Sequence, residues 1–454
     1  MTIPFCDPEA CASAGCAPTT CQGAGVSSNH SLFERSKAAI PGGVNSSIRA
    51  FKAVGGEPFV VASAEGATIT DVEGRTYIDL VQSYGAVILG HAHPAVTAAI
   101  TAATPSGTSY GAPTPREMKL AEAISERVPS CERVRLMNSG TEATSTAIRL
   151  ARGVTGRDRI VTFAGNFHGA TDALLVAGGS GVATLGLPGT AGVPNASVAE
   201  TMVTPYNVVP ELDEHVAAVI VEPVAANMGV VAPADGFLAG LRAECDRVGA
   251  LLIFDEVITG FRLGRGGAQG KYDIRPDITC FGKVIGGGLP IGAIGGSVQI
   301  MEHLSPLGPV FHAGTLSGNP IATAAGLAAL NQLTDDVYAD LEAQAGRLAA
   351  RLADACVAAG LAARFPVVGT LFGVVLGDEL AGPSPVAVAN FDDAKRTDEA
   401  AYARFFQALL AGGVAIAPGA YEAIFIGVGH SDAIMDRIVD IAHIAAAEAV
   451  AAVD

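Results

Sequence analysis

Residues 251–288 read LLIFDEVITGFRLGRGGAQGKYDIRPDITCFGKVIGGG and contain two short apolar runs, Leu251–Phe254 and Ile278–Phe281. Continuous apolar runs of this length between turn residues are typical of strands that are buried on both faces of a parallel sheet. The first run ends in Asp255 and Glu256, and the second is followed by Gly282 and Lys283. Charged side chains therefore stand where two buried strands end.

Further apolar runs alternate with helical stretches between residues 88 and 334, namely Arg133–Met137, Ile160–Phe163 and Ala217–Val221. Strands that alternate with helices are typical of a parallel sheet covered by helices. We therefore predict a large α/β domain over residues 88–334.

The segments on either side of this domain do not show the same alternation of strands and helices. We expect a flexible lead over residues 1–30, an N-terminal segment over 31–87 and a small α+β domain over 335–454. Apolar residues at helical spacing predict two helices. The first has Val337, Leu341, Leu348 and Leu352 on one face. The second begins after the N-cap Ser431 and has Ile434, Ile438, Ile441 and Ile444 on one face. Residues Arg364–Leu376 and Val414–Pro418 are predicted to be strands.

Composition excludes several classes of protein. The chain has 454 residues, of which 50% are hydrophobic, and a formal net charge of -17. Such a core argues against disorder, and such a charge argues against binding to nucleic acid. The uncharged stretches within Asp172–Glu200 and Val284–Met301 contain too many glycines and prolines for a membrane-spanning helix. No signal-peptide pattern is present, so we expect a cytoplasmic enzyme.

The cysteines form two groups. Cys6, Cys11, Cys16 and Cys21 recur every five residues, a spacing that zinc sites seldom show, so a tail without a metal role is favoured over a metal or redox site. The others lie among apolar residues and are expected to fill the core: Cys131, Cys245, Cys280 and Cys356. No metal site is predicted.

A phosphate site is one interpretation of Ser139, Gly140 and Thr141, which follow a strand and open a helix. Free N–H groups at a helix start, together with two hydroxyls, bind phosphate well. An ordinary capped helix would use the same residues. The motif is neither a dinucleotide fingerprint nor a P-loop, because Val284 follows Lys283 where a P-loop has Ser or Thr.

Asp255 and Lys283 complete a possible cofactor site. A carboxylate at the end of a buried strand needs a partner, which is either a structural arginine or a pyridinium N–H. A desolvated lysine becomes a nucleophile for carbonyls, unless it reaches solvent. A phosphate site, an acid and a lysine in this order indicate pyridoxal 5′-phosphate (PLP).

These residues and several longer stretches resemble the class III aminotransferases of PLP fold type I and, within them, the glutamate-1-semialdehyde 2,1-aminomutase family. The resemblance runs from about Leu32 to His430. It is carried by PGGVNSSIRAF (41–51), ILGHAHP (88–94), GTSYGAPT (107–114), NSGTEA (138–143), EPVAANMGV (222–230), FDEVITGF (254–261), GKVIGGG (282–288) and GTLSGNP (314–320). It implies a seven-stranded, mostly parallel sheet in the large domain and a homodimer with PLP at the subunit interface.

The resemblance also implies roles for single residues. Lys283 would carry the cofactor and move protons, Asp255 would pair with the pyridine nitrogen, and Ser139, Gly140 and Thr141 would hold the phosphate. Thr315 would reach the phosphate from the partner subunit. Phe167, His168, Asn227 and Val257 would surround the ring. The substrate would meet Ser46, Arg49, Tyr84 and Glu422, with Glu422 placed among the catalytic groups.

The implied reaction belongs to an isomerase of tetrapyrrole (porphyrin) biosynthesis. Glutamate 1-semialdehyde would become 5-aminolevulinate through 4,5-diaminovalerate, as the cofactor cycles with pyridoxamine 5′-phosphate. The glycine-rich segment 165–194 would be a mobile gate that retains the intermediate, although an ordinary surface loop is the alternative.

Several positions depart from the family pattern. Tyr84 replaces Trp, Phe167 and Phe311 replace Tyr, and His312 replaces Gln, while Gly427 and Gly429 replace Ser and Ala and Ala170 stands where a second His is usual. Loss of two phenols removes hydrogen-bond donors and can change substrate choice. The alternative is therefore an intermolecular class III transaminase that acts on another amino or oxo compound.

Overall fold

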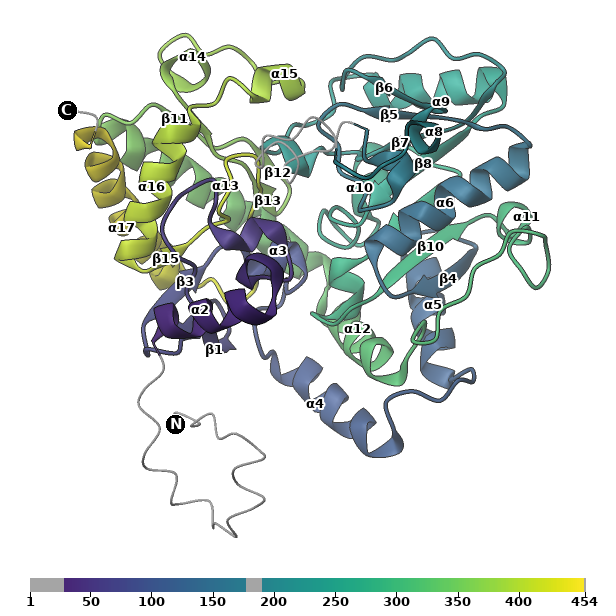
Figure 1. The fold of residues 1–454 in the computed structure, drawn as a ribbon, viewed down its shortest axis with the longest axis horizontal. Coiled ribbons are helices and arrows are strands. Elements are labelled where there is room, and N and C mark those ends of the chain that lie inside the picture. The colour runs from purple at the N-terminus through teal and green to yellow at the C-terminus, as the bar shows by residue number, and fades with distance from the viewer. Residues whose placement is uncertain (1–27, 177–189, 453–454) are drawn as a thin grey trace.

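The protein is centred on a seven-stranded sheet with the order β4-β10-β9-β8-β7-β5-β6 (Figure 1). The computed structural model describes residues 28–176 and 190–452. The strands are β4 (Arg133–Met137), β5 (Arg159–Phe163), β6 (Thr201–Thr204), β7 (Val216–Val221), β8 (Leu251–Glu256), β9 (Ile278–Phe281) and β10 (Gly292–Gly296). Only β10 runs antiparallel to its neighbours, so the expectation of a mostly parallel sheet is confirmed.

Both faces of this sheet are buried. Ile253 packs in the cluster that contains helix α6 (Gly140–Thr155), whereas Leu252 and Phe254 pack in the cluster that contains α9 (Phe237–Val248). Successive side chains of a strand point to opposite faces. The strand is therefore apolar at every position from 251 to 254 because each face is covered by a helix.

The predicted strands were placed correctly, with small shifts at their ends. β4 and β9 have the predicted bounds, β5 and β7 each begin one residue earlier, and β8 continues through Glu256. β6 and β10 were not predicted. The sequence of β10 is Gly-Ala-Ile-Gly-Gly, and a Cβ on Gly295 would lie 2.5 Å from Sγ of Cys131. Close packing explains these glycines, and the strand propensities of single residues do not predict it.

A second region joins the two ends of the chain. Strands β1 (Val61–Glu65), β2 (Thr68–Asp71) and β3 (Thr76–Asp79) form a sheet with β15 (Val414–Ala415), which runs parallel to β3. Figure 1 shows the purple N-terminal elements beside the yellow C-terminal helices α16 (Glu399–Gly412) and α17 (Asp432–Ala451). The small α+β region therefore includes elements from both ends of the chain.

The C-terminal strands are shorter than predicted. The prediction of one strand over Arg364–Leu376 was wrong. Pro366, Gly369 and Gly373 interrupt this segment, which forms four two-residue strands. These are β11 (Ala363–Arg364), β12 (Val367–Val368), β13 (Leu371–Phe372) and β14 (Val375–Leu376), with β16 (Ile424–Phe425) completing a three-stranded sheet beside β13. The strand over Val414–Pro418 is confined to β15.

Both predicted C-terminal helices form. Helix α13 (Asp335–Ala358) buries Leu341, Leu348 and Leu352, with Val337 partly buried. In α17 the Oγ of Ser431 accepts the N–H of Ile434 at 3.4 Å, and Ile438 is buried. Ile444 is 59% exposed, so the predicted helix face is buried only in part. The close packing of α17 against α13 and α16 uses small residues instead, namely Ala442, Ala445, Ala446 and Ala449.

The remaining helices are α2 (Asn29–Ala39), α3 (Gln82–Gly85), α4 (Pro94–Ala103), α5 (Pro115–Arg127), α8 (Asn195–Val198), α10 (Gly267–Tyr272), α11 (Val298–Met301), α12 (Pro320–Gln332), α14 (Asp378–Ala381) and α15 (Phe391–Ala394). Short 3-10 turns are η1 (Pro41–Gly43), η2 (Ser47–Ala50), η3 (Thr104–Ser106), η4 (Asp172–Leu174), η5 (Ala226–Met228) and η6 (Lys283–Gly286). Across 28–176 and 190–452, no helix has the length and apolarity needed to span a membrane.

The four core cysteines are buried and free, as predicted: Cys131, Cys245, Cys280 and Cys356. Burial raises the pKa of the Cys131 thiol to about 12. Cys6, Cys11, Cys16 and Cys21 lie outside the described residues, as does most of the predicted lead. Of the predicted gate, residues 177–189 also lie outside them.

Candidate active site

Helix α6 begins at the carboxyl end of β4 and forms one end of the site. Ser139 is its N-cap, and the Ser139 Oγ accepts the N–H of Glu142 at 3.1 Å. Thr141 Oγ1 accepts the N–H of Ala170 at 3.2 Å, which ties the segment after β5 to the helix start. The first N–H groups of a helix lack partners inside the helix. An anion would find both these N–H groups and two hydroxyls here.

Asp255 lies inside β8 and is 4% exposed. Its Oδ2 is 2.7 Å from Nδ1 of His168, and its Oδ1 accepts the N–H of Val257 at 3.0 Å. His168 is also buried, and no hydrogen-bond partner for its Nε2 is found among the residues that the structure describes. These contacts fix the orientation of the carboxylate at the sheet edge.

Glu222, which follows β7, connects two walls of the site. Its Oε1 accepts the N–H of Phe167 at 2.6 Å, and its Oε2 accepts the N–H of Ala226 at 3.0 Å and Nδ2 of Asn227 at 2.9 Å. Burial raises the pKa of this carboxyl to about 7, although the charge of His168 opposes the shift. Glu222 is therefore a buried acceptor that positions Phe167 and Asn227.

Lys283 comes two residues after the end of β9 and has a positive φ of 46°. Burial lowers the pKa of its amine, while Asp255, Glu222 and Glu422 oppose that shift. A left-handed conformation is unusual for a residue with a Cβ, and such residues occur often at functional sites. The local backbone thus directs a desolvated lysine toward the acids.

These elements enclose a cavity of about 220 Å³. Nine of the predicted cofactor-binding residues line it: Ser139, Gly140, Thr141, Phe167, His168, Asn227, Asp255, Val257 and Lys283. A Cβ on Gly140 would lie 3.0 Å from the Val257 methyl groups, so glycine keeps the helix start close to the apolar floor. An anion site at one end, a carboxylate and a lysine around an apolar floor fit the PLP predicted from the sequence.

The predicted substrate residues lie outside this lining, and Arg49, Tyr84 and Glu422 lie close to one another. Burial raises the pKa of the Tyr84 phenol, Glu422 raises it further, and Arg49 opposes the shift. The same Glu422 carboxylate acts on Lys283. Ser46 is the N-cap of the turn η2, which carries Arg49. Arg49, Tyr84 and Glu422 are thus close enough for their charges to interact.

Thr315 does not line the cavity. It lies in the exposed segment that precedes α12, near Phe311, which is 69% exposed. A second hollow of about 640 Å³ adjoins the first through Thr141 and is lined by the start of α6 together with Phe311 and His312.

Comparison with known proteins places this geometry in a family. The model of the class-III aminotransferases matches residues 51–428. The chain belongs to the class III aminotransferase family.

Within this class III family, a curated relative from Nitratidesulfovibrio vulgaris, a glutamate-1-semialdehyde 2,1-aminomutase, is 49% identical over 418 residues, 90% of this chain and 97% of its own length. An omega-transaminase from Sphaerobacter thermophilus has a TM-score of 0.85 at 33% identity and covers 93% of this chain and 98% of its own. A transaminase with PLP bound has a TM-score of 0.82 at 31% identity, with 93% and 98% covered.

Several residues around the class III aminotransferase site were not singled out in the sequence. Glu222, Thr144, Gly169 and Ile258 line the cavity, and the Thr144 Oγ1 donates to the carbonyl of His168 at 2.6 Å. Glu222 follows the fully apolar strand β7. A carboxylate directly after a buried strand is the same signal that identifies Asp255 in β8.

Proposed function

We propose that this chain is a PLP-dependent aminomutase that converts glutamate 1-semialdehyde to 5-aminolevulinate through 4,5-diaminovalerate. The observation that carries the proposal is the arrangement of Lys283, Asp255 and the start of α6 around one cavity. The reaction itself is taken from the relatives, which share 49% identity over nearly their whole length.

Bound PLP supplies an electron-withdrawing ring that makes protons on a neighbouring carbon acidic and lets an amino group change carrier. The chain provides the setting. Ser139, Gly140 and Thr141 would hold the phosphate, and the Asp255 carboxylate, whose direction is fixed by His168 and the Val257 N–H, would pair with the ring nitrogen. The start of a helix favours an anion, because its first N–H groups point outward along the helix axis.

Lys283 is the group that moves protons. Its lowered pKa leaves more of the amine neutral near pH 7 than an exposed lysine would have. A neutral amine can take a proton from one carbon and return it to another, which an amino-group exchange requires at two positions. Glu422, the carboxylate that acts on both Lys283 and Tyr84, is the second proposed catalytic group.

Arg49 and Ser46 bind the substrate carboxylate in this proposal. A guanidinium matches a carboxylate with two parallel hydrogen bonds, and a hydroxyl adds a third. Tyr84 closes this side of the site next to Glu422. The position of Arg49 on the short turn η2, near Tyr84, supports this assignment.

The site is completed by a second copy of the chain. Leu307, Phe311 and Leu316 are 67%, 69% and 51% exposed in the segment that precedes α12. Large apolar side chains gathered in one exposed segment mark an interaction surface. In the proposed homodimer this segment would lie against the partner subunit, and Thr315 would reach the phosphate bound there.

An intermolecular transaminase is the second candidate. Phe167 and Phe311 lack the phenols usual in the aminomutases, and two solved structures of similar fold are transaminases at 33% and 31% identity. Fewer donors around the ring would suit a less polar substrate.

One assay separates the two functions. Purified protein receives glutamate 1-semialdehyde without any amino donor, and 5-aminolevulinate is followed. Formation of 5-aminolevulinate at a steady rate supports the aminomutase. Turnover only when an amine donor and an oxo acceptor are both present supports the transaminase instead.

A further inference from the structure

Four consecutive residues after β3 have positive φ angles. The values are 46° for Gln82, 52° for Ser83, 53° for Tyr84 and 91° for Gly85. Only glycine adopts this region without strain, and side chains with a Cβ persist there only when surrounding contacts hold them. The turn α3, which carries Tyr84, is therefore maintained by its neighbours rather than by its own sequence.

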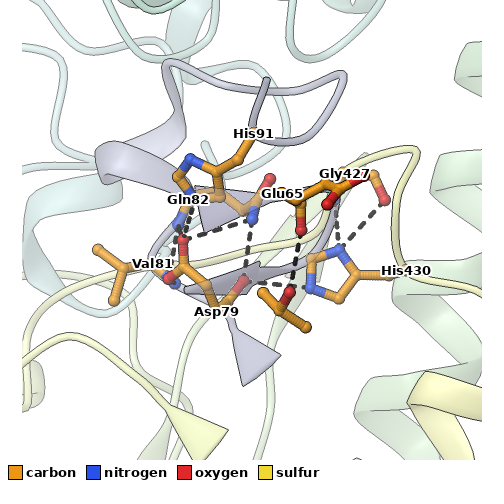
Figure 2. Close-up of polar contacts among 8 residues, drawn as sticks. Glu65, Asp79, Val81, Gln82, His91, Gly427 and His430 are labelled. Carbon is orange, nitrogen blue, oxygen red and sulfur yellow. Dashed lines mark hydrogen bonds and ion pairs between the residues drawn. The ribbon is translucent and has the colours of Figure 1, made fainter. Parts of the chain in front are cut away.

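Asp79 holds the first end of this turn (Figure 2). Its Oδ1 accepts the N–H groups of Val81 at 2.8 Å and Gln82 at 3.2 Å, and its Oδ2 lies 2.6 Å from Nε2 of His91. The Asp79 carbonyl accepts Nε2 of Gln82 at 3.0 Å and Nε2 of His430 at 3.1 Å. Asp79, Gln82 and His430 are buried in this network, which fixes where the turn begins.

Arg262 holds the other end. Its Nε and Nη2 donate to the carbonyl of Gly85 at 3.3 and 3.0 Å, and its Nη1 donates to the carbonyl of Ile426 at 3.0 Å. The guanidinium is also 5.2 Å from the ring centre of Phe425. A Cβ on Gly85 would lie 2.7 Å from that ring, so the turn and β16 are in close contact.

The environment of Arg262 is unusual for a charged group. The side chain is 0% exposed, and none of the ion pairs found in the described chain includes it. Burial lowers the pKa of its guanidinium to about 9. A buried charge without a carboxylate is costly. Here the carbonyls of Gly85 and Ile426 accept its N–H groups instead.

The groups that Arg262 joins surround the proposed substrate side of the site. The Gly85 carbonyl directly follows Tyr84, and Ile426 lies four residues after Glu422. Arg262 itself follows Asp255 on the segment after β8, and its carbonyl accepts Oγ1 of Thr370 at 2.9 Å. One side chain thereby ties the cofactor side of the site to two walls that come from opposite ends of the chain.

We propose that Arg262 is a positioning residue that holds the strained turn Gln82–Gly85, so that Tyr84 faces the substrate next to Glu422. The placement of the substrate rests on the proposed function, whereas the effect of Arg262 on the orientation of Tyr84 does not.

The first test uses fluorescence. The chain has no tryptophan, so Tyr84→Trp places a single indole in the turn. In this background Arg262→Met is expected to shift the emission to longer wavelength and to lower its anisotropy, because residue 84 gains water contact and freedom. Arg262→Lys keeps the charge but has one nitrogen to serve two carbonyls, and it should give a smaller change.

Arg157→Met is the matched control. Nη1 of Arg157 also donates to two main-chain carbonyls, those of Val216 at 3.0 Å and Val248 at 2.9 Å, but these lie at the start of β7 and the end of α9. It should lose stability without changing the emission of the indole in the turn. Equal emission changes in Arg262→Met and Arg157→Met would overturn the proposal.

The second test is a double-mutant cycle on kcat/KM with Arg262→Met and Tyr84→Ala. A displacement of about 1 Å costs on the order of 100-fold in rate, so Arg262→Met alone should lower kcat/KM by about that factor. In Tyr84→Ala the same substitution should cost far less, because Arg262 acts through Tyr84. Additive losses would contradict the inference.

The two proposals fail separately. If the unmodified enzyme makes no 5-aminolevulinate, the aminomutase function is wrong, yet the indole emission of the Tyr84→Trp background still decides the role of Arg262. If Arg262→Met does not fold, Arg262→Lys carries both tests, and an unchanged emission and unchanged kcat/KM in that variant would refute the proposal.

Discussion

Glu222 accepts hydrogen bonds from both walls of the cofactor cavity, and it is fully enclosed. Its pKa of about 7 in the folded protein compares with 4.5 for an ordinary glutamate. The folded state therefore binds more protons than the unfolded chain between these two values, and the free energy of unfolding falls as pH rises from about 4.5 to 7. The change is about 3 kcal/mol at most, and it levels off above pH 7.

Glu222→Gln should remove this component. We expect the melting temperature of the variant to rise relative to that of the unmodified protein as pH increases from 5 to 7, with the slope of the difference as the observable. Differential scanning fluorimetry at half-unit pH steps measures it.

Glu244→Gln is the control for that series. Its carboxyl has a pKa lowered to about 2 by Arg247 and by the N–H of Leu212, so it is ionised in both states above pH 5. Its difference curve should be flat. A flat curve for Glu222→Gln as well would show that this carboxyl titrates normally.

Lys283→Ala should abolish turnover to the detection limit, because no other described group combines an amine with the cavity. Borohydride treatment of the unmodified holoenzyme should attach the cofactor to the peptide that contains Lys283, as read by mass spectrometry. Lys271→Ala, which removes a surface pair with Glu342 at 3.0 Å, should retain both activity and attachment. Attachment to another lysine would contradict the site.

At the scale of elements, helix α12 approaches the segment of Lys283 through a glycine. A Cβ on Gly326 would collide with the carbonyl of Ile285 in η6. Gly326→Ala should therefore push η6 aside, lowering stability by about 1–3 kcal/mol and weakening cofactor binding. Equilibrium unfolding in urea and cofactor titration measure the two effects.

Gly346 provides the opposite case. It lies inside helix α13, is exposed, and a Cβ at this position would have no atom within 4 Å. Gly346→Ala should stabilise the protein by about 0.5–1 kcal/mol, because alanine loses less backbone entropy. If Gly326→Ala and Gly346→Ala changed stability similarly, the contact between residue 326 and the Ile285 carbonyl would not determine the effect of Gly326→Ala.

The strands of the large sheet were predictable because burial on two faces leaves an apolar run in the sequence. β10 was not, since its glycines reflect contacts with Ser139 and Cys131 rather than a strand preference. The four two-residue strands after α13 were also missed in detail, because turns, and not hydrophobic patterns, set their limits.

The residues of the site were predictable where a charged side chain follows a buried strand. Asp255 and Lys283 stood out because charges rarely follow apolar strands without a role. Arg262 follows a turn after β8 and belongs to no periodic pattern. Its partners, the carbonyls of Gly85 and Ile426, are main-chain groups far away in sequence, and the sequence alone cannot identify such contacts.

At the scale of the whole molecule, the proposed homodimer depends on the exposed segment before α12. Phe311→Asp should shift the protein toward a monomer and raise the dissociation constant for PLP, because an acidic side chain would oppose the apolar contact and withdraw the partner's Thr315. Sedimentation equilibrium and cofactor titration measure these changes.

Val357→Asp is the matched substitution. Val357 is 61% exposed and belongs to α13, not to the segment before α12, and the variant should keep the oligomeric state of the unmodified protein. An unmodified protein that sediments as a monomer with PLP bound would rule out the shared site.

The parallel pairing of β3 with β15 has a consequence during synthesis. Ile78 aligns with Val414, so the early ladder stays open on one side until about 340 more residues have left the ribosome. The closing contacts join residues far apart in the sequence, and such non-local pairing forms slowly. A nascent chain would thus expose an unpaired strand edge for much of its translation, and chaperone capture and aggregation during expression should both concentrate on residues 61–79.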